Sequence, residues 1–473
     1  MKLSPKFGFA LTSLSIAAAM LACSLFTGAP TPTVAPESPT PESTPTELPT
    51  IASPQPTIDE AAPTEKNTVD PNAPVPAGEL GVFNINVYQD EYDYWYFNAL
   101  VMNNTDRTVD SIEIEVAAVG ATGDILYSET TYPSLYSLTP GEVSPISTWF
   151  WDENFTADTQ FTAEIVGYSS TEIERSALTF QGTTMSEGGG YLNITGEVLN
   201  SSGQPLNING LAAATFDATG NMIMAGSASA DIGYLDPDQT APFRISLTSP
   251  KEGTAVVSDY VLYSDASISE TSENYALAFL GKRDYIDTDG FYHLVGEIQN
   301  NSSVKLNIRL IAGIYDANDV VLDADTVDLP IYALAPGETI SYNFQNWTAL
   351  NNVSDLAQNS ARYTVQWDPG WTWDTQYTYI DLPYSDAGYE YDDFWGLVFK
   401  GKVSNNSGGS VSSATIVINI RDAAGNLLFT DDAGVYEEIP DGGSADYEVT
   451  IPIELNFDTT NLIYEIIAKG ELP

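Results

Sequence analysis

One short pattern occurs four times in the sequence, and each copy ends in asparagine: Ala99-Leu100-Val101-Met102-Asn103-Asn104, Gly196-Glu197-Val198-Leu199-Asn200, Gly296-Glu297-Ile298-Gln299-Asn300-Asn301 and Gly401-Lys402-Val403-Ser404-Asn405-Asn406. Successive copies lie 97, 100 and 105 residues apart. Alternating apolar and polar residues are typical of a β-strand with one buried face. The spacing predicts four units of about 100 residues, the size of one β-sandwich domain.

A turn signature follows each copy: Val119-Gly120-Ala121-Thr122-Gly123, Phe216-Asp217-Ala218-Thr219-Gly220, Tyr315-Asp316-Ala317-Asn318-Asp319 and Arg421-Asp422-Ala423-Ala424-Gly425. Asp near the start and Gly at the end suit a short hairpin turn with a bulge, in which the last residue is left-handed. Asp319 replaces Gly in the third copy, and Asp also tolerates that conformation. A second turn then follows each signature: Pro140-Gly141-Glu142, Pro237-Asp238-Gln239, Pro336-Gly337-Glu338 and Pro440-Asp441-Gly442.

These strands and turns predict an all-β fold, because helical periodicity is nearly absent. We expect four tandem antiparallel immunoglobulin-like β-sandwiches, at residues 80–171, 172–267, 268–373 and 374–473. The order of Gly-Glu-Val-x-Asn, aromatic-Asp-x-x-Gly and Pro-Gly-Glu resembles the FxLYD family of bacterial extracytoplasmic β-sandwich domains, most closely in the second and third units. The resemblance implies an envelope or surface protein, and it carries over no catalytic residue.

The N-terminal residues 1–22 are typical of a lipoprotein signal peptide. Lys2 and Lys6 precede the uncharged stretch Phe7–Ala22, and Met20-Leu21-Ala22-Cys23 is similar to a bacterial lipobox. We therefore expect lipidation of Cys23 and attachment to the membrane through that lipid. Cleavage at a nearby position without lipidation, which would give a soluble secreted protein, is the alternative.

Residues 23–79 are expected to form a disordered linker rich in Pro, Thr and Ser. Residues 27–78 contain 13 of the 28 prolines in the chain. Proline removes backbone donors, and a segment this poor in apolar residues buries too little surface to fold. The linker would act as an extended spacer.

The composition excludes several classes of function. The 473 residues include 16 Lys and Arg against 65 Asp and Glu, a formal net charge of −49. Such a chain repels nucleic acid phosphates, so no nucleic acid partner is expected. Cys23 and His293 are the only Cys and His, so no intrachain disulfide, Cys-rich zinc site or catalytic triad without His293 is available. We therefore expect a protein that is not an enzyme.

Exposed aromatic residues are the main candidates for ligand contact. Trp371, Trp373 and Tyr377 follow the turn Pro369-Gly370, and a second cluster spans Tyr92–Phe97. Aromatic rings beside carboxylates suit the apolar faces and hydroxyls of sugars. Packing in the sandwich cores or at the domain junctions is the competing interpretation.

Calcium is the one cofactor that the sequence suggests. Asp287 and Asp289 lie in an acidic loop, and Ca²⁺ prefers clustered carboxylates. A solvated hairpin tip explains the same residues, because the full calcium-loop pattern is missing. Otherwise no cofactor is expected.

Taken together, these features suggest a surface-tethered extracytoplasmic lipoprotein that serves as a non-catalytic interaction or structural array. Its partners would be the membrane and glycans or envelope proteins. A carbohydrate-binding surface protein is the alternative, and a secreted hydrolase ranks behind both.

Overall fold

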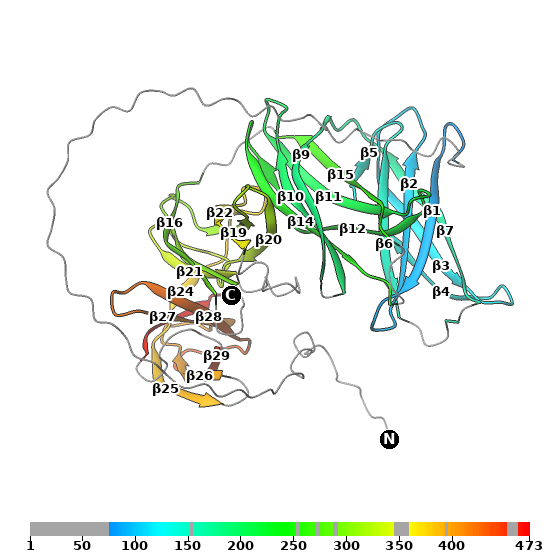
Figure 1. Ribbon diagram of the computed structural model, residues 1–473. Coiled ribbons are helices and arrows are strands. Elements are labelled where there is room, and N and C mark those ends of the chain that lie inside the picture. Colours follow the sequence, from blue (N-terminus) through cyan, green and yellow to red (C-terminus); the bar gives the residue numbers. More distant parts are fainter. Residues whose placement is uncertain are drawn as a thin grey trace, which may run out of the picture. The chain divides into compact units, whose positions relative to one another are not determined.

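The alternating segments form antiparallel β-strands, as the sequence predicts, and the chain is an all-β array of immunoglobulin-like sandwiches (Figure 1). A computed structural model describes residues 75–151, 155–156, 158–188, 190–251, 256–269, 275–286, 292–344, 359–392, 396–451 and 462–473. These residues all belong to one compact unit, Pro63–Pro473. The signal peptide, Cys23, nearly all of the linker, Asp287 and Asp289 lie outside the described residues.

Sandwich 1 has two sheets. The first sheet contains β1 (Leu80–Gln89), β2 (Trp95–Asn103) and β6 (Val143–Phe150). The second contains β4 (Ile125–Thr131), β3 (Val109–Val119) and β7 (Gln160–Ser170), with the short β5 (Ser137–Leu138) also paired to β3. The first, second and fifth long strands thus form one layer, and the third, fourth and sixth form the other.

Sandwich 2 repeats this order. One layer contains β9 (Thr179–Gly188), β10 (Tyr191–Leu199) and β14 (Thr240–Thr248). The other contains β12 (Met222–Ala230), β11 (Leu206–Phe216) and β15 (Asp259–Ile268), with the short β8 (Arg175–Ser176) and β13 (Tyr234–Leu235) at its margins. β12 also pairs with β14 and so links the two layers.

Sandwiches 3 and 4 have the same layers. In sandwich 3, one layer contains β16 (Leu277–Ile286), β17 (Tyr292–Asn300) and β21 (Thr339–Phe344). The other contains β20 (Val321–Asp328), β19 (Arg309–Tyr315) and β22 (Arg362–Trp367). The short β18 (Leu306–Asn307) pairs with β23 (Trp373–Asp374). In sandwich 4, one layer contains β25 (Tyr384–Asp392), β26 (Gly396–Ser404) and β29 (Ser444–Ile451). The other contains β28 (Leu427–Val435), β27 (Ser413–Arg421), β30 (Ile463–Glu471) and β24 (Tyr379–Asp381).

The asparagine that ends each repeated pattern is a buried hydrogen-bonding centre. Asn200, for example, is fully buried and donates to the carbonyl oxygens of Gln204 (2.7 Å) and Leu235 (2.9 Å). Its Oδ1 accepts the backbone N–H (3.1 Å) and hydroxyl (2.7 Å) of Ser202. Equivalent bonds are made by Asn103, Asn300 and Asn405. A buried amide needs this full set of partners, which explains the fixed asparagine and the Ser or Thr two residues later.

The turn signatures also form as predicted. Gly123, Gly220 and Gly425 have φ between 85° and 88°, and Asp319 has φ of 63°. The carboxylate of Asp217 accepts the backbone N–H groups of Thr219 (2.8 Å) and Asn221 (2.9 Å). This is why Asp opens the signature in three of the four units.

Consecutive sandwiches pack front to back. We call the outer face of the layer with the third, fourth and sixth strands the front face, and the outer face of the other layer the back face. Ala212 and Met222 on the front face of sandwich 2 join the core cluster of sandwich 1. Ile311 of sandwich 3 and Val417 of sandwich 4 likewise join the clusters of sandwiches 2 and 3. The same pair of faces is therefore buried at all three junctions.

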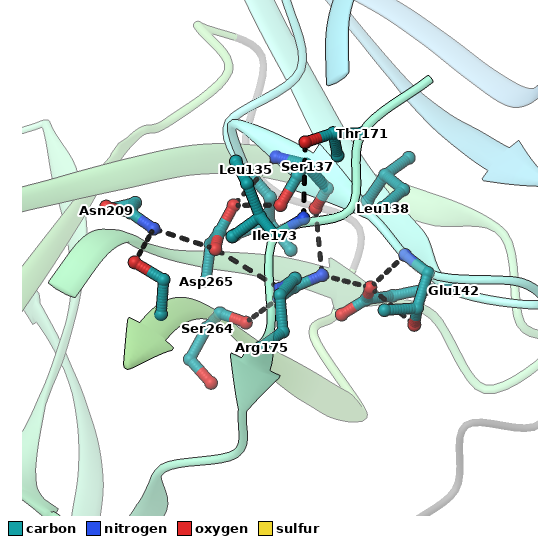
Figure 2. Close-up of polar contacts among 12 residues, drawn as sticks. Leu135, Ser137, Leu138, Glu142, Thr171, Ile173, Arg175, Asn209, Ser264 and Asp265 are labelled. Atoms are coloured by element: carbon teal, nitrogen blue, oxygen red, sulfur yellow. Dashed lines mark hydrogen bonds and ion pairs between the residues drawn. The ribbon is translucent and has the colours of Figure 1, made fainter. Parts of the chain in front are cut away.

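Buried ion pairs also cross the junctions. At the first, the Arg175 guanidinium lies between Asp265 (3.2 Å) and Glu142, and it donates to the carbonyl oxygens of Ser137 and Ser264 at 2.9 Å each (Figure 2). Asp265 also accepts the backbone N–H of Ser137 at 2.7 Å. At the second junction, Arg244 pairs with Asp323 (2.9 Å) and Asp325 (3.6 Å).

Candidate functional site

The three aromatic residues singled out in the sequence lie together around one cavity of about 360 Å³ in sandwich 3. We call this cavity the sandwich 3 groove, and its lining residues are Asn307, Arg309, Asp328, Tyr332, Trp371, Trp373 and Tyr377. Trp371, Trp373 and Tyr377 are 49, 45 and 51% exposed. The groove therefore presents accessible rings next to one carboxylate, one guanidinium and one amide.

The chain positions Trp371 through a turn that is fixed to sandwich 2. The buried carboxylate of Asp368 accepts the backbone N–H groups of Gly370 and Gly233, each at 2.9 Å. Gly370 must lack a side chain, because a Cβ there would overlap the backbone of Gly233. The turn is consequently held by a neighbouring domain as well as by its own hydrogen bonds.

The other rings of the groove are held by strand pairing and by a lysine. β23 brings Trp373 opposite Asn307 of β18. Lys305 donates to the carbonyl oxygen of Tyr377 (2.8 Å), and the Tyr377 ring lies 6.1 Å from that of Tyr332. The guanidinium of Arg309 lies 5.2 Å from the centre of the Trp371 ring, so the chain itself supplies a cation to this aromatic wall.

Four carboxyl groups at the second junction have raised pKa values, in each case mainly because burial penalises the charged form. The pKa rises to about 7 for Asp368 and to about 6 for Asp231, where Arg309 opposes the shift. It rises to about 7 for Asp323 and also rises for Asp325, where Arg244 opposes both shifts. At the second junction, ionisation of these carboxyl groups is therefore linked to packing.

In the second aromatic cluster, Tyr92–Phe97, some side chains point into the core and others point toward the surface. Phe97 is fully buried in the core, and Trp95 packs against Phe155 and Phe161. Tyr92, Tyr94 and Tyr96 instead line a second cavity, described below. Core packing thus describes Trp95 and Phe97, and surface exposure describes Tyr92, Tyr94 and Tyr96.

His293 is buried at the third junction. Its ring stacks on Tyr285 at 4.8 Å and contacts Phe429 of sandwich 4 edge-on at 5.8 Å. Among the residues that the structure describes, no group of three or more His, Cys, Asp or Glu side chains could hold a metal ion. Within the same part of the chain, no helix is long and apolar enough to cross a membrane.

Sequence reasoning missed the residues that the fold adds to the groove. Arg309 and Tyr332 lie 39 or more positions before Trp371 in the sequence, and no local pattern marks them. The run Trp149-Phe150-Trp151 is a signal that could have identified the second cavity, since Trp149 lines it.

No protein-family model matches the sequence, and no curated protein matches it. Several solved structures match it. Native α2-macroglobulin of Escherichia coli has 9% identity and a TM-score of 0.12, over 82% of this chain and 28% of that chain. Its trypsin-activated form has 10% identity and a TM-score of 0.13, over 83% and 40%. This chain spans less than half the length of those proteins. At these values the matches support no statement about activity.

Proposed function

We propose that the chain is a non-catalytic array of β-sandwich domains that works outside the cytoplasm, tethered to the membrane by a lipid on Cys23. The observation that carries the proposal is the front-to-back junction, which recurs between all consecutive sandwiches with the same faces buried. Repeated burial of one pair of faces builds a continuous array, in which terminal units need polar outer faces. Interaction or spacing at the cell envelope is the use that such an array suits.

The tether is tested by a Cys23→Ser variant expressed in a bacterium that lipidates its exported proteins. We expect the unchanged chain to incorporate labelled palmitate and to partition into detergent, since more than one acyl chain anchors stably. The Cys23→Ser variant should lose the label and leave the membrane fraction, whereas Ser24→Ala should retain both. Retention of Cys23→Ser in the membrane fraction would contradict the tether.

Carbohydrate binding in the sandwich 3 groove is the second candidate. It is favoured by the convergence of Trp371, Trp373, Tyr377 and Tyr332 on one accessible cavity that also contains hydrogen-bonding groups. A glycan array probed with the chain, with calcium and with EDTA, tests both this function and the acidic loop around Asp287 and Asp289.

Binding should disappear in a Trp371→Ala, Trp373→Ala double variant. It should persist in Tyr436→Ala, a matched control that removes a ring 90% exposed on sandwich 4. Loss of binding in EDTA would assign calcium to the acidic loop. A negative array under both conditions would rule out the carbohydrate function and leave the array and its tether intact.

A further inference from the structure

A second cavity, of about 390 Å³, lies between sandwiches 1 and 2. We call it the junction cleft, and its lining residues are Asp90, Glu91, Tyr92, Tyr94, Tyr96, Trp149, Gly190, Tyr191, Thr248, Ser249, Pro250 and Lys251. Its volume falls within the range of small-molecule sites. Five aromatic side chains and two carboxylates therefore meet in a space of ligand size, away from the sandwich 3 groove.

The aromatic walls are held in place by the turn between β1 and β2. The Asp90 carboxylate is almost fully buried and accepts the backbone N–H groups of Tyr92 and Tyr94, each at 2.9 Å. The Tyr94 ring meets Trp149 edge-on at 5.2 Å, and Tyr96 stacks on Tyr88 at 5.5 Å. The backbone of the turn and the rings of Tyr94, Tyr96 and Trp149 are thus ordered before any ligand arrives, which lowers the entropic cost of binding.

The charge of the cleft favours a cation. Asp90, Glu91 and Lys251 line the cleft, and the ammonium group of Lys251 is paired with Asp93, so these four side chains together carry a net negative charge. The chain as a whole carries a net charge of −49, so its field concentrates cations near the surface. A neutral ligand would desolvate the exposed Glu91 carboxylate without compensating its charge, and that is unfavourable.

Aromatic faces combined with carboxylates are the chemistry that recognises alkylated ammonium groups, because the ring quadrupoles attract the cation while the methyl groups remove apolar surface from water. The sandwich 3 groove shows the same contact within the chain, where Arg309 lies over Trp371. We propose that the junction cleft binds a quaternary ammonium group, of the choline type. Tyr92 and Trp149 supply aromatic faces, Glu91 supplies charge, and Asp90 is a positioning residue.

The test is calorimetric titration of the full chain with choline and with 3,3-dimethylbutan-1-ol, which has the same shape without the charge. Choline should bind at least tenfold more tightly than the uncharged compound, and more weakly as salt is added. Equal affinity for the two compounds, or binding of glucose in place of choline, would overturn the proposal.

Variants locate the site. Tyr92→Ala and Trp149→Ala should each weaken choline binding about tenfold, and both side chains are more than half exposed, so the fold should persist. Glu91→Gln should weaken it severalfold, while Tyr136→Ala, an equally exposed ring outside the cleft, should leave it unchanged. Unaltered binding in all three cleft variants would also overturn the proposal.

Vesicles distinguish the source of the ammonium group. Binding to phosphatidylcholine vesicles that free choline reverses, with none to phosphatidylglycerol vesicles, would identify a lipid headgroup. Binding of choline alone would identify a free cation.

Discussion

The covered faces of the array and the two faces at its ends carry different residues at equivalent positions. Four residues before the end of the third strand, the front faces have Glu115, Ala212, Ile311 and Val417, of which only Glu115 is exposed. Five residues before the buried asparagine, the back faces have Asn98, Thr195, Val295 and Lys400, of which only Lys400 is substantially exposed. The four sandwiches have the same strand order. Whether another sandwich covers a given face correlates with whether the residue at the equivalent position is charged or not.

Charged residues lie on the two outer faces that no other described sandwich covers. Glu115 pairs directly opposite Glu164 on the front face of sandwich 1, a like-charge pair that is tolerated because water reaches both groups. On the back face of sandwich 4, Lys402 pairs with Asp446 at 2.5 Å on the surface. At both of these faces the charges are solvated, whereas the inner faces bury apolar groups, hydrogen-bonded polar groups and paired ions such as Arg244 with Asp323.

The largest effect on stability is expected when a glutamate, the residue type found at the exposed position 115, replaces the equivalent buried Ile311. Ile311→Glu should lower the free energy of unfolding by at least about 4 kcal/mol, because it removes a buried apolar side chain and buries a carboxylate. Guanidinium denaturation measures the loss. The reverse exchange, Glu115→Ile, should change the free energy of unfolding by less than about 1 kcal/mol. Equal losses in the two variants would contradict the comparison.

A smaller effect is expected from the buried ion pairs. Arg244→Met should cost about 3 kcal/mol, because Asp323 and Asp325 would remain buried without their cation. Urea denaturation measures the difference. Replacing Asp323 and Asp325 by Leu and Ala as well should recover part of the loss. Failure of the triple variant to recover any stability would show that the arginine acts by packing and not by charge.

The pH dependence should distinguish the second junction from the exposed turns. Asp231, Asp323 and Asp368 have pKa values raised to about 6, 7 and 7, so the folded chain holds more protons than the unfolded chain between about pH 4 and 7. Stability therefore falls as the pH rises through that window. Thermal melts should show a higher midpoint at pH 5 than at pH 8.

The turn acids act in the opposite direction. Hydrogen bonds, first from the Thr219 hydroxyl, lower the pKa of Asp217 to about 2, so its contribution is lost only as the pH falls below about 4. Asp231→Asn should flatten the dependence above pH 4 and leave the acid limb unchanged. An unaltered slope in this variant would attribute the dependence to the net charge of the chain instead.

The smallest effect is expected at the surface of the last sandwich. Lys402→Ala should change the free energy of unfolding by at most about 0.5 kcal/mol, because both partners of its ion pair are exposed. Chemical denaturation at low and high salt measures it. A loss comparable to that of Arg244→Met would show that the back face of sandwich 4 is not an ordinary solvated surface.

The β-strands and the turn conformations were predictable from the sequence. The left-handed conformation of Asp319 followed from its place in the turn signature, and the antiparallel strands followed from alternation. These features depend on residues that are neighbours in the chain, so a single sequence contains the information.

The junctions were not predictable in the same way. Alternation identifies two faces of a strand, but it does not say which outer face another domain will cover. Arg421 reaches Glu297 across 124 positions, and Arg244 reaches Asp323 across 79. Trp371 was predicted to lie at a turn, yet its partners Arg309 and Gly233 come from two other parts of the fold.

The buried asparagines have a consequence for producing the protein. Asn103-Asn104-Thr105, Asn200-Ser201-Ser202, Asn300-Asn301-Ser302 and Asn405-Asn406-Ser407 all fit the acceptor pattern for N-linked glycans. In the folded chain each of these amide nitrogens is enclosed and donates two hydrogen bonds. A eukaryotic secretory host attaches glycans before folding is complete, and a sugar at any of these positions would block closure of its sandwich. Bacterial expression avoids that conflict.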